Sequence, residues 1–124
     1  MSAGFTWLFV AIGGGLGALL RYWVGFLVGT TGLFPWATII INIAGSFAIG
    51  WLWAFAGDSV WFQNWGRALL VIGLLGGFTT FSAFSLDVHT LQTTNQLLQA
   101  IAYVVVTVAG CLLGVWAGVR LGSL

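Results

Sequence analysis

Two sets of polar residues that could bind an ion recur at helical spacing within apolar segments. Thr38, Asn42 and Ser46 are four residues apart in one segment, and Tyr103 and Thr107 are four residues apart in another. Residues at this spacing share one face of a helix, so each helix would carry one polar stripe. The stripes offer amide and hydroxyl donors without Asp or Glu, which favours a small anion over a cation. Asn42 could instead join two helices by a hydrogen bond, the commoner role of a single polar residue among transmembrane helices.

The segment GGFTTFSAFS, residues 76–85, places two glycines, four hydroxyls and three phenyl rings directly after an apolar run. Glycine and β-branched threonine are poor helix formers, so the segment predicts an unwound helix whose freed backbone groups face protein or a wet cavity. The alternative is that Gly76 and Gly77 allow close helix packing while the hydroxyls bond back to their own helix. Phe81 and Phe84 lie three residues apart and would share a face, as two ordinary core residues also would.

The composition excludes a soluble globular protein. Of the 124 residues, 60% are hydrophobic and 4% are charged, and the mean hydropathy is +1.11. Such a chain has too little polar surface to cover a water-soluble fold, so its expected surroundings are the lipid bilayer. The formal charge of +1 provides no basic patch, and no nucleic-acid partner is expected.

The apolar residues divide into four segments, each close to the length of about 20 residues that a transmembrane helix needs. The sequence therefore predicts an all-α integral membrane protein with a single transmembrane domain, residues 1–124. The four helices are expected near residues 5–28, 35–56, 66–92 and 97–120.

The third predicted helix is the irregular one. Its purely apolar part, residues 68–78, cannot cross about 30 Å of hydrocarbon at a rise of about 1.5 Å per residue. This span must therefore continue through the interruption at residues 76–85. The break between the first two helices has a simpler basis, because residues 29–32 form a turn cluster of glycine and threonine.

Glycines repeat every four residues in the first and fourth segments, a pattern that allows two helices to pack very closely. Because four short, closely packed helices leave little room for an aqueous pore, at least a dimer is expected. The repeats are Gly13 and Gly17, on one face with Arg21, and Gly110, Gly114, Gly118 and Gly122.

The positive charges give almost no preferred orientation in the membrane. With four spans both termini lie on one side, which carries Arg67 and Arg120, while the other side has Arg21 and the chain has no lysine. Such a weak bias predicts insertion in both orientations. Two protomers could then pair antiparallel around a two-fold axis in the membrane plane, as inverted repeats do in transporters.

Two other functional classes fit the sequence less well. A four-helix transporter of the small multidrug type would need a carboxylate in its first helix to couple protons to cationic drugs, and none is present there. An enzyme would need a nucleophile, a base and an orienting group at motif spacing. Asp58, Asp87 and His89 form no such set, so solvated roles at helix ends and in a loop are expected for them.

Three motifs, in order and at their spacing, carry a family resemblance. They are GGGLGALLRY at 13–22, TIIINIAGSF at 38–47 and GGFTTFSAF at 76–84. Together they resemble the CrcB/Fluc family of fluoride channels over nearly the whole chain. The resemblance implies an antiparallel, dual-topology homodimer in the bacterial inner membrane, with two narrow pores. These pores would export cytoplasmic fluoride passively down its electrochemical gradient and so confer fluoride resistance.

The resemblance also implies roles for individual residues. A structural sodium ion would be held on the two-fold axis by the backbone carbonyls of Gly76 and Thr79 from both protomers. Ala83 stands where many members have a hydroxyl, so no side-chain role is expected there. The fluoride pore would be lined by Asn42, Phe81 and Phe84, with Thr38, Ser82, Tyr103, Thr107 and Arg21 as further pore residues.

Overall fold

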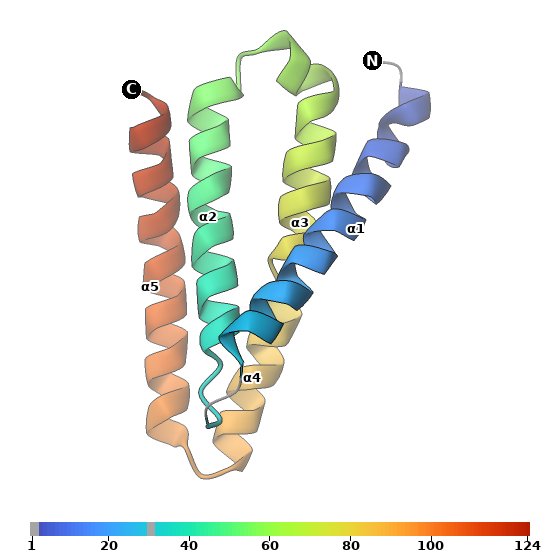
Figure 1. The fold of residues 1–124 in the computed structure, drawn as a ribbon. Coiled ribbons are helices and arrows are strands. Elements are labelled where there is room, and N and C mark those ends of the chain that lie inside the picture. Colours follow the sequence, from blue (N-terminus) through green and yellow to red (C-terminus); the bar gives the residue numbers. More distant parts are fainter. Residues whose placement is uncertain (1–2, 30–31) are drawn as a thin grey trace.

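The computed structural model describes residues 3–29 and 32–124, and every regular element in these ranges is a helix. Four long apolar helical segments are candidate membrane spans, and the third consists of three shorter helices (Figure 1). The predictions of an all-α fold and of four candidate spans are therefore confirmed. The elements are α1 (Ala3–Val28), α2 (Trp36–Ala56), η1 (Phe62–Leu75), α3 (Gly76–Phe78), α4 (Phe81–Thr93) and α5 (Leu97–Gly122).

The third span begins at Phe62, earlier than the start expected near residue 66. Its first piece, η1, is a π-helix, a more loosely wound helix in which amides bond to carbonyls five residues back. This piece includes Gln63 and Asn64, two polar residues that hydropathy alone would leave in a loop. From Phe62 to Thr93 the span has 32 residues, so it is long enough to cross a bilayer despite its interruption.

Two helix pairs pack at backbone contact: α2 lies along α5, and α1 crosses η1 and α3 (Figure 1). A Cβ atom added to Gly17 would overlap the carbonyl oxygen of Leu74, and one added to Gly118 would overlap that of Phe47. Glycine is required at both positions because any side chain would push the paired helices apart. The two glycine repeats therefore determine the two close helix pairs, as their spacing predicted.

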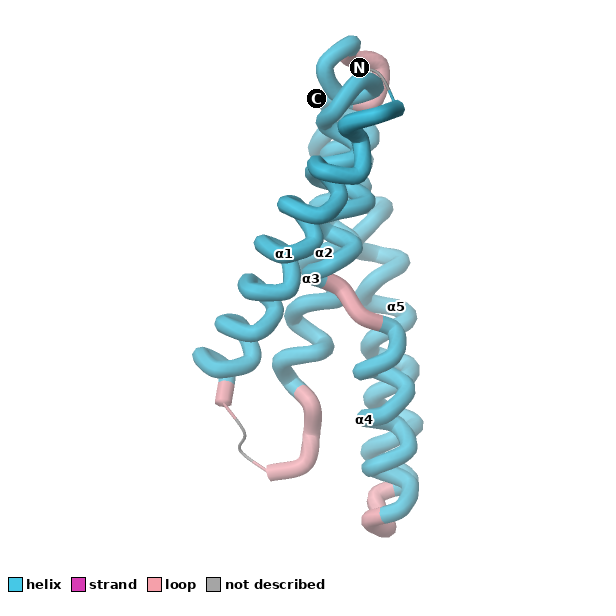
Figure 2. The backbone as a smooth tube through the Cα atoms, turned by 90° about the vertical axis from the view of Figure 1, so that its right-hand side faces the viewer, coloured by secondary structure: helices cyan, strands magenta, loops and turns pink. Residues whose placement is uncertain are grey.

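The interruption of the third span lies at Thr79 and Thr80, whose backbones are extended (φ −85°, ψ 156° and φ −153°, ψ 121°). Figure 2 shows it as the short loop between α3 and α4. The prediction that this segment is interrupted is confirmed, but Gly76 and Gly77 themselves remain helical. Gly77 serves packing instead, because a Cβ there would overlap the carbonyl oxygen of Gly14 on α1. The β-branched residues unwind because their crowded Cβ atoms favour extended backbone.

The first residues of α1 and the last residues of α5 lie at the same end of the molecule, as an even number of spans requires (Figure 1). In the turn cluster after α1, Gly29 and Gly32 have φ of +70° and +81°, which glycine adopts without strain. The other two residues of that predicted turn, Thr30 and Thr31, lie outside the described ranges. His89, expected in a loop, lies within α4.

Candidate functional site

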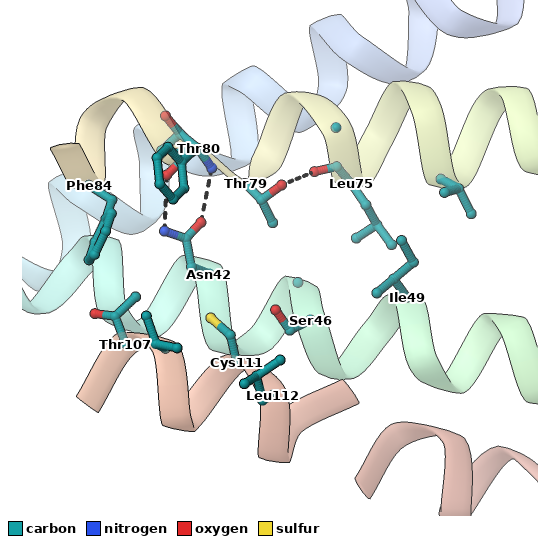
Figure 3. Close-up of a pocket in the computed structure, with 15 residues that line it drawn as sticks. Asn42, Ser46, Ile49, Leu75, Thr79, Thr80, Phe84, Thr107, Cys111 and Leu112 are labelled. Carbon is teal, nitrogen blue, oxygen red and sulfur yellow. Dashed lines mark hydrogen bonds between the residues drawn. The ribbon is translucent and has the colours of Figure 1, made fainter. Parts of the chain in front are cut away.

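A cavity of about 450 Å³ opens between α2, the interrupted third span and α5 (Figure 3). It reaches the molecular surface, because Phe81 in its lining is 77% exposed. Its polar side chains come from α2, the interruption and α5, and the other lining residues are apolar. The lining residues with polar side chains are Asn42, Ser46, Thr79, Thr80, Thr107 and Cys111.

Asn42 holds the interruption in place through two hydrogen bonds to one residue. Its Nδ2 donates to the carbonyl oxygen of Thr80 at 3.1 Å, and its Oδ1 accepts from the backbone N–H of Thr80 at 2.9 Å (Figure 3). The side-chain oxygen thus replaces the helical acceptor that the Thr80 N–H gives up, and Nδ2 adds a donor to the Thr80 carbonyl. One N–H of the Asn42 amide remains beyond the bond to Thr80, since this group has two donor hydrogens.

The interruption releases the carbonyl of Gly77, which acquires a new donor. The carbonyl oxygen of Leu75 keeps its helical donor, the backbone N–H of Thr79 at 2.9 Å, and also accepts from Oγ1 of Thr79 at 2.8 Å. The carbonyl oxygen of Gly77 accepts from Nε of Arg21 on α1 at 3.1 Å. Arg21 therefore ties α1 to the end of α3.

The carbonyls of Gly76 and Thr79 lose the donors that a continuous helix would give them. The N–H of Thr80, four residues after Gly76, donates to Asn42. The N–H of Ala83, four residues after Thr79, donates to Oγ1 of Thr80, which caps α4 at 3.1 Å. Gly76 and Thr79 both line the cavity. Two released carbonyl oxygens beside one cavity are the hard, neutral ligands that suit an alkali-metal cation.

The two phenylalanines after the interruption have different surroundings. Their ring centroids are 5.4 Å apart with an interplanar angle of 50°. Phe81 is exposed, whereas Phe84 is 8% exposed and belongs to the core cluster with Ile39, Leu91 and Tyr103. Both rings line the cavity. The edge of a phenyl ring carries positive partial charge, so a ring edge turned into a cavity is a weak anion partner.

Thr107 brings an unused polar atom to the same cavity. The residue is 4% exposed, and its Oγ1 has no hydrogen-bond partner within the described part of the chain. Cys111 lies one helical turn further along α5 and also lines the cavity (Figure 3). A buried hydroxyl without an acceptor is costly unless something else binds it, so Thr107 is free to donate to a bound species.

The cavity brings together part of the predicted site. Asn42, Phe81, Phe84 and Thr107 line it, as do both predicted sodium ligands, whereas four other predicted pore residues do not. Ser82 is exposed, with Oγ 3.1 Å from Oγ1 of Thr80. The remaining three are Thr38, Tyr103, whose hydroxyl donates to Asp87, and Arg21, which lines a separate pocket of about 540 Å³ on α1.

Two residues at or near the cavity have contacts that the sequence did not predict. Gly45 faces the interruption, because a Cβ there would overlap Cγ2 of Thr79. Its spacing of three from Asn42 places both on one helix face, a signal that the sequence did contain. Asp87 was expected to be solvated, yet its Oδ2 accepts from the hydroxyl of Tyr103 at 2.8 Å. The three-residue spacing of Phe84 and Asp87 could have suggested that they meet the same neighbour.

Comparison with known proteins agrees with this arrangement. The family model described as CrcB-like protein, Camphor Resistance (CrcB), matches residues 8–119. A protein of Rhodospirillum rubrum named "Fluoride-specific ion channel FluC" is 47% identical over 117 residues, or 91% of each chain. Proteins of the same name from Hahella chejuensis and Rhizobium meliloti are 40% identical over 121 residues and 43% identical over 116 residues. These alignments cover 94% of both chains in the first case, and 92% of this chain and 93% of the relative in the second. With its interrupted third span and a match over nearly its whole length, the chain belongs to the CrcB-like family.

Proposed function

We propose that this protein is a fluoride-selective ion channel, and not an enzyme, that lets fluoride leave the cytoplasm passively across the bacterial inner membrane. The observation that carries the proposal is the similarity, over at least nine-tenths of the chain, to proteins named fluoride-specific ion channels. The donor-lined cavity beside the interrupted span supports it independently.

The chemistry of the cavity suits fluoride. Fluoride is small and strongly hydrated, so a passage must replace its water with converging donors. The second N–H of Asn42 and the hydroxyl of Thr107 are such donors. The edges of Phe81 and Phe84 add positive partial charge. Their apolar rings offer too few hydrogen-bond partners to replace the hydration shell of a competing ion.

The direction of transport follows from acid chemistry and the membrane potential. Fluoride enters acidified cells as neutral hydrogen fluoride and dissociates inside. An inside-negative potential drives an anion outward with about 2.3 kcal/mol per elementary charge for each 100 mV. A passive pore therefore lowers cytoplasmic fluoride and confers resistance without a coupled ion.

The functional unit is an antiparallel homodimer. In a single chain the polar cavity reaches the lipid-facing surface beside the exposed Phe81, and polar groups left in hydrocarbon are costly. A second copy placed over this face would cover them. The near absence of a charge bias, with Arg67 and Arg120 opposed by Arg21, supports insertion of the two copies in opposite orientations.

A structural sodium ion bridges the two protomers. The released carbonyl oxygens of Gly76 and Thr79 would hold it, two from each copy. When bound, the ion would satisfy these carbonyls in a water-poor interior and place a fixed positive charge near the anion path. The cavity side of the interruption is where a second copy would have to approach to complete this set.

Liposomes that contain only this protein test the proposed function. Wild-type protein should release trapped fluoride when a potassium ionophore sets the membrane potential, and should retain trapped chloride under the same conditions. Phe81→Ile and Phe84→Ile fill similar volume, which in a core typically costs less than about 1.5 kcal/mol, but remove the ring edge. Both should yield folded dimers in which fluoride flux is reduced by at least about tenfold, as expected for loss of about 1.4 kcal/mol of anion stabilisation.

Phe5→Ile is the matched control, because Phe5 is an exposed phenylalanine near the start of α1, outside the cavity. Its flux should equal that of the wild type. Retention of fluoride by wild-type liposomes would refute the channel proposal. Wild-type flux in folded Phe81→Ile and Phe84→Ile dimers would leave the channel standing but return both rings to a packing role.

A further inference from the structure

Asp87 is the one carboxylate that contacts a predicted pore residue within the described ranges 3–29 and 32–124. Its Oδ2 accepts a hydrogen bond of 2.8 Å from the hydroxyl of Tyr103, which joins α4 to α5. Tyr103 is completely buried. Because its hydroxyl hydrogen is committed to Asp87, Tyr103 is not free to donate that hydrogen to an anion.

Tyr103 is enclosed by aromatic rings as well as by Asp87. Its ring centroid lies 5.2 Å from that of Phe84, with an interplanar angle of 39°. Phe34 also contacts the tyrosine ring, edge-on, at 5.7 Å and 79°. The side chain of Thr38 on α2 also reaches the Tyr103 hydroxyl. Two aromatic rings and a hydrogen bond from its hydroxyl therefore hold the tyrosine side chain.

Asp87 and Phe84 lie three residues apart on α4 and both engage Tyr103. Residues at this spacing are neighbours on one helix face, so both side chains contact Tyr103 from the same helix. If Tyr103 tilted, Phe84 would lose one of its packing partners, and the hydrogen bond to Asp87 opposes that tilt. A hydrogen bond to an ionised carboxylate is roughly twice as strong as a neutral one, which suits this restraining role.

We propose that Asp87 is a positioning residue that fixes the orientation of the Phe84 ring by anchoring Tyr103. The proposal rests on the proposed channel function, in which the edge of Phe84 faces fluoride. Asp87 touches neither the cavity nor the ion in this account, and its effect passes through one hydrogen bond and one ring contact. It is an acceptor for Tyr103 and not an electrostatic partner of the anion.

A double-mutant cycle on fluoride flux in liposomes tests the anchoring contact. Asp87→Ala and Tyr103→Phe should each lower flux by about tenfold, the equivalent of one lost charge-assisted hydrogen bond. The double variant should be no slower than either single variant, because both remove the same contact. Asp87→Asn keeps an acceptor oxygen while removing the charge, so it should retain flux within about threefold of the wild type.

The control on the same helix is His89→Ala, because His89 is exposed two residues further along α4. Its flux should match the wild type. Additive losses in the double variant would overturn the proposal. A change in Asp87→Asn as large as in Asp87→Ala would also overturn it, because charge and not position would then be responsible. If Asp87→Ala fails to fold, Tyr103→Phe and Asp87→Asn still decide the question.

A second readout does not depend on conduction. With 4-fluorophenylalanine at position 84, the fluorine NMR signal should report a restrained ring in the wild-type dimer and a shifted, more mobile ring in Tyr103→Phe and Asp87→Ala. Asp87→Asn should keep the wild-type signal. An unchanged signal in Tyr103→Phe would refute the positioning role. Absence of wild-type fluoride flux would instead refute the channel function, so the two failures are distinguishable.

Discussion

At the scale of single residues, Asn42 shows why an amide and no other short polar group suits its position. It must accept from the N–H of Thr80 and donate to the carbonyl of the same residue. Aspartate could only accept, and serine has too short a side chain to span both atoms. Asparagine completes the pair and retains one more N–H for the cavity.

Replacing Asn42 with serine should therefore damage stability and transport together. The lost contacts leave the half-buried N–H of Thr80 without an acceptor and remove one donor from its carbonyl, which we expect to cost about 1–3 kcal/mol of unfolding free energy. Fluoride flux should fall as sharply as in the phenylalanine variants. Thermal unfolding in detergent and liposome efflux measure the two effects. Ser46→Ala, on the same face of α2, is the control and should leave the unfolding free energy nearly unchanged. An equal loss of stability in both variants would contradict a special role for the hydrogen bonds between Asn42 and Thr80.

At the scale of elements, the interrupted third span differs from an ordinary helix kink because side chains from other helices bind its released backbone groups. Thr80 is held by Asn42 and caps α4, and Gly77 is held by Arg21. The close crossing of α1 over α3 at Gly77 keeps the upper piece helical up to the threonines. Gly76 and Thr79 line the cavity, and their carbonyls are the pair that we propose to bind sodium.

If main-chain oxygens bind the sodium ion, removing the Thr79 side chain should have little effect on binding, unlike in a site built from side-chain ligands. Thr79→Ala keeps the carbonyl oxygen and should leave sodium binding largely intact. Gly76→Leu would place a bulky side chain in the cavity where the ion and the second protomer meet, and should abolish binding. Difference maps from crystals grown with sodium or with a heavier monovalent cation would locate the ion. Loss of the ion in Thr79→Ala with retention in Gly76→Leu would contradict binding by the carbonyls of Gly76 and Thr79. The absence of an ion on the two-fold axis of the wild-type dimer would contradict it as well.

At the scale of the whole molecule, the distribution of positive charge is the main determinant of orientation. The start of α1 and the end of α5 lie at one end of the bundle (Figure 1), and the sequence has three positive residues, all arginine. One of them, Arg120, packs over the ring of Trp116 at 5.3 Å from its centroid. With so few charges in flanking segments, neither side of the membrane retains this chain strongly.

Reporter fusions at the C-terminus should therefore be found on both sides of the membrane in comparable amounts. Two lysines introduced beside Arg67 should fix one orientation, because insertion follows the positive residues near the ends of the spans. Such a variant should be inactive alone and regain fluoride flux when a copy fixed in the opposite orientation is supplied. A uniform orientation of the unmodified chain would exclude the antiparallel dimer.

The sequence by itself determined the features that depend on short stretches of chain. Hydropathy over about 20 residues indicated four spans, because burying each segment in lipid is a sum over its own residues. The four-residue glycine repeats indicated the close helix pairs, and β-branched threonines after an apolar run indicated the interruption. The same local rules also expected Gly76 and Gly77 to unwind with the threonines, and both remain helical.

Only the tertiary structure decided which groups meet across the bundle. The contact of Asn42 with Thr80 joins residues 38 positions apart, and that of Tyr103 with Asp87 joins residues 16 positions apart. Neither follows from helical periodicity, which fixes the face of a residue but not the height or tilt of the neighbouring helix. Gly76 and Gly77 stay helical because α1 packs against this piece of the span, an effect of packing that outweighs their weak helix propensity.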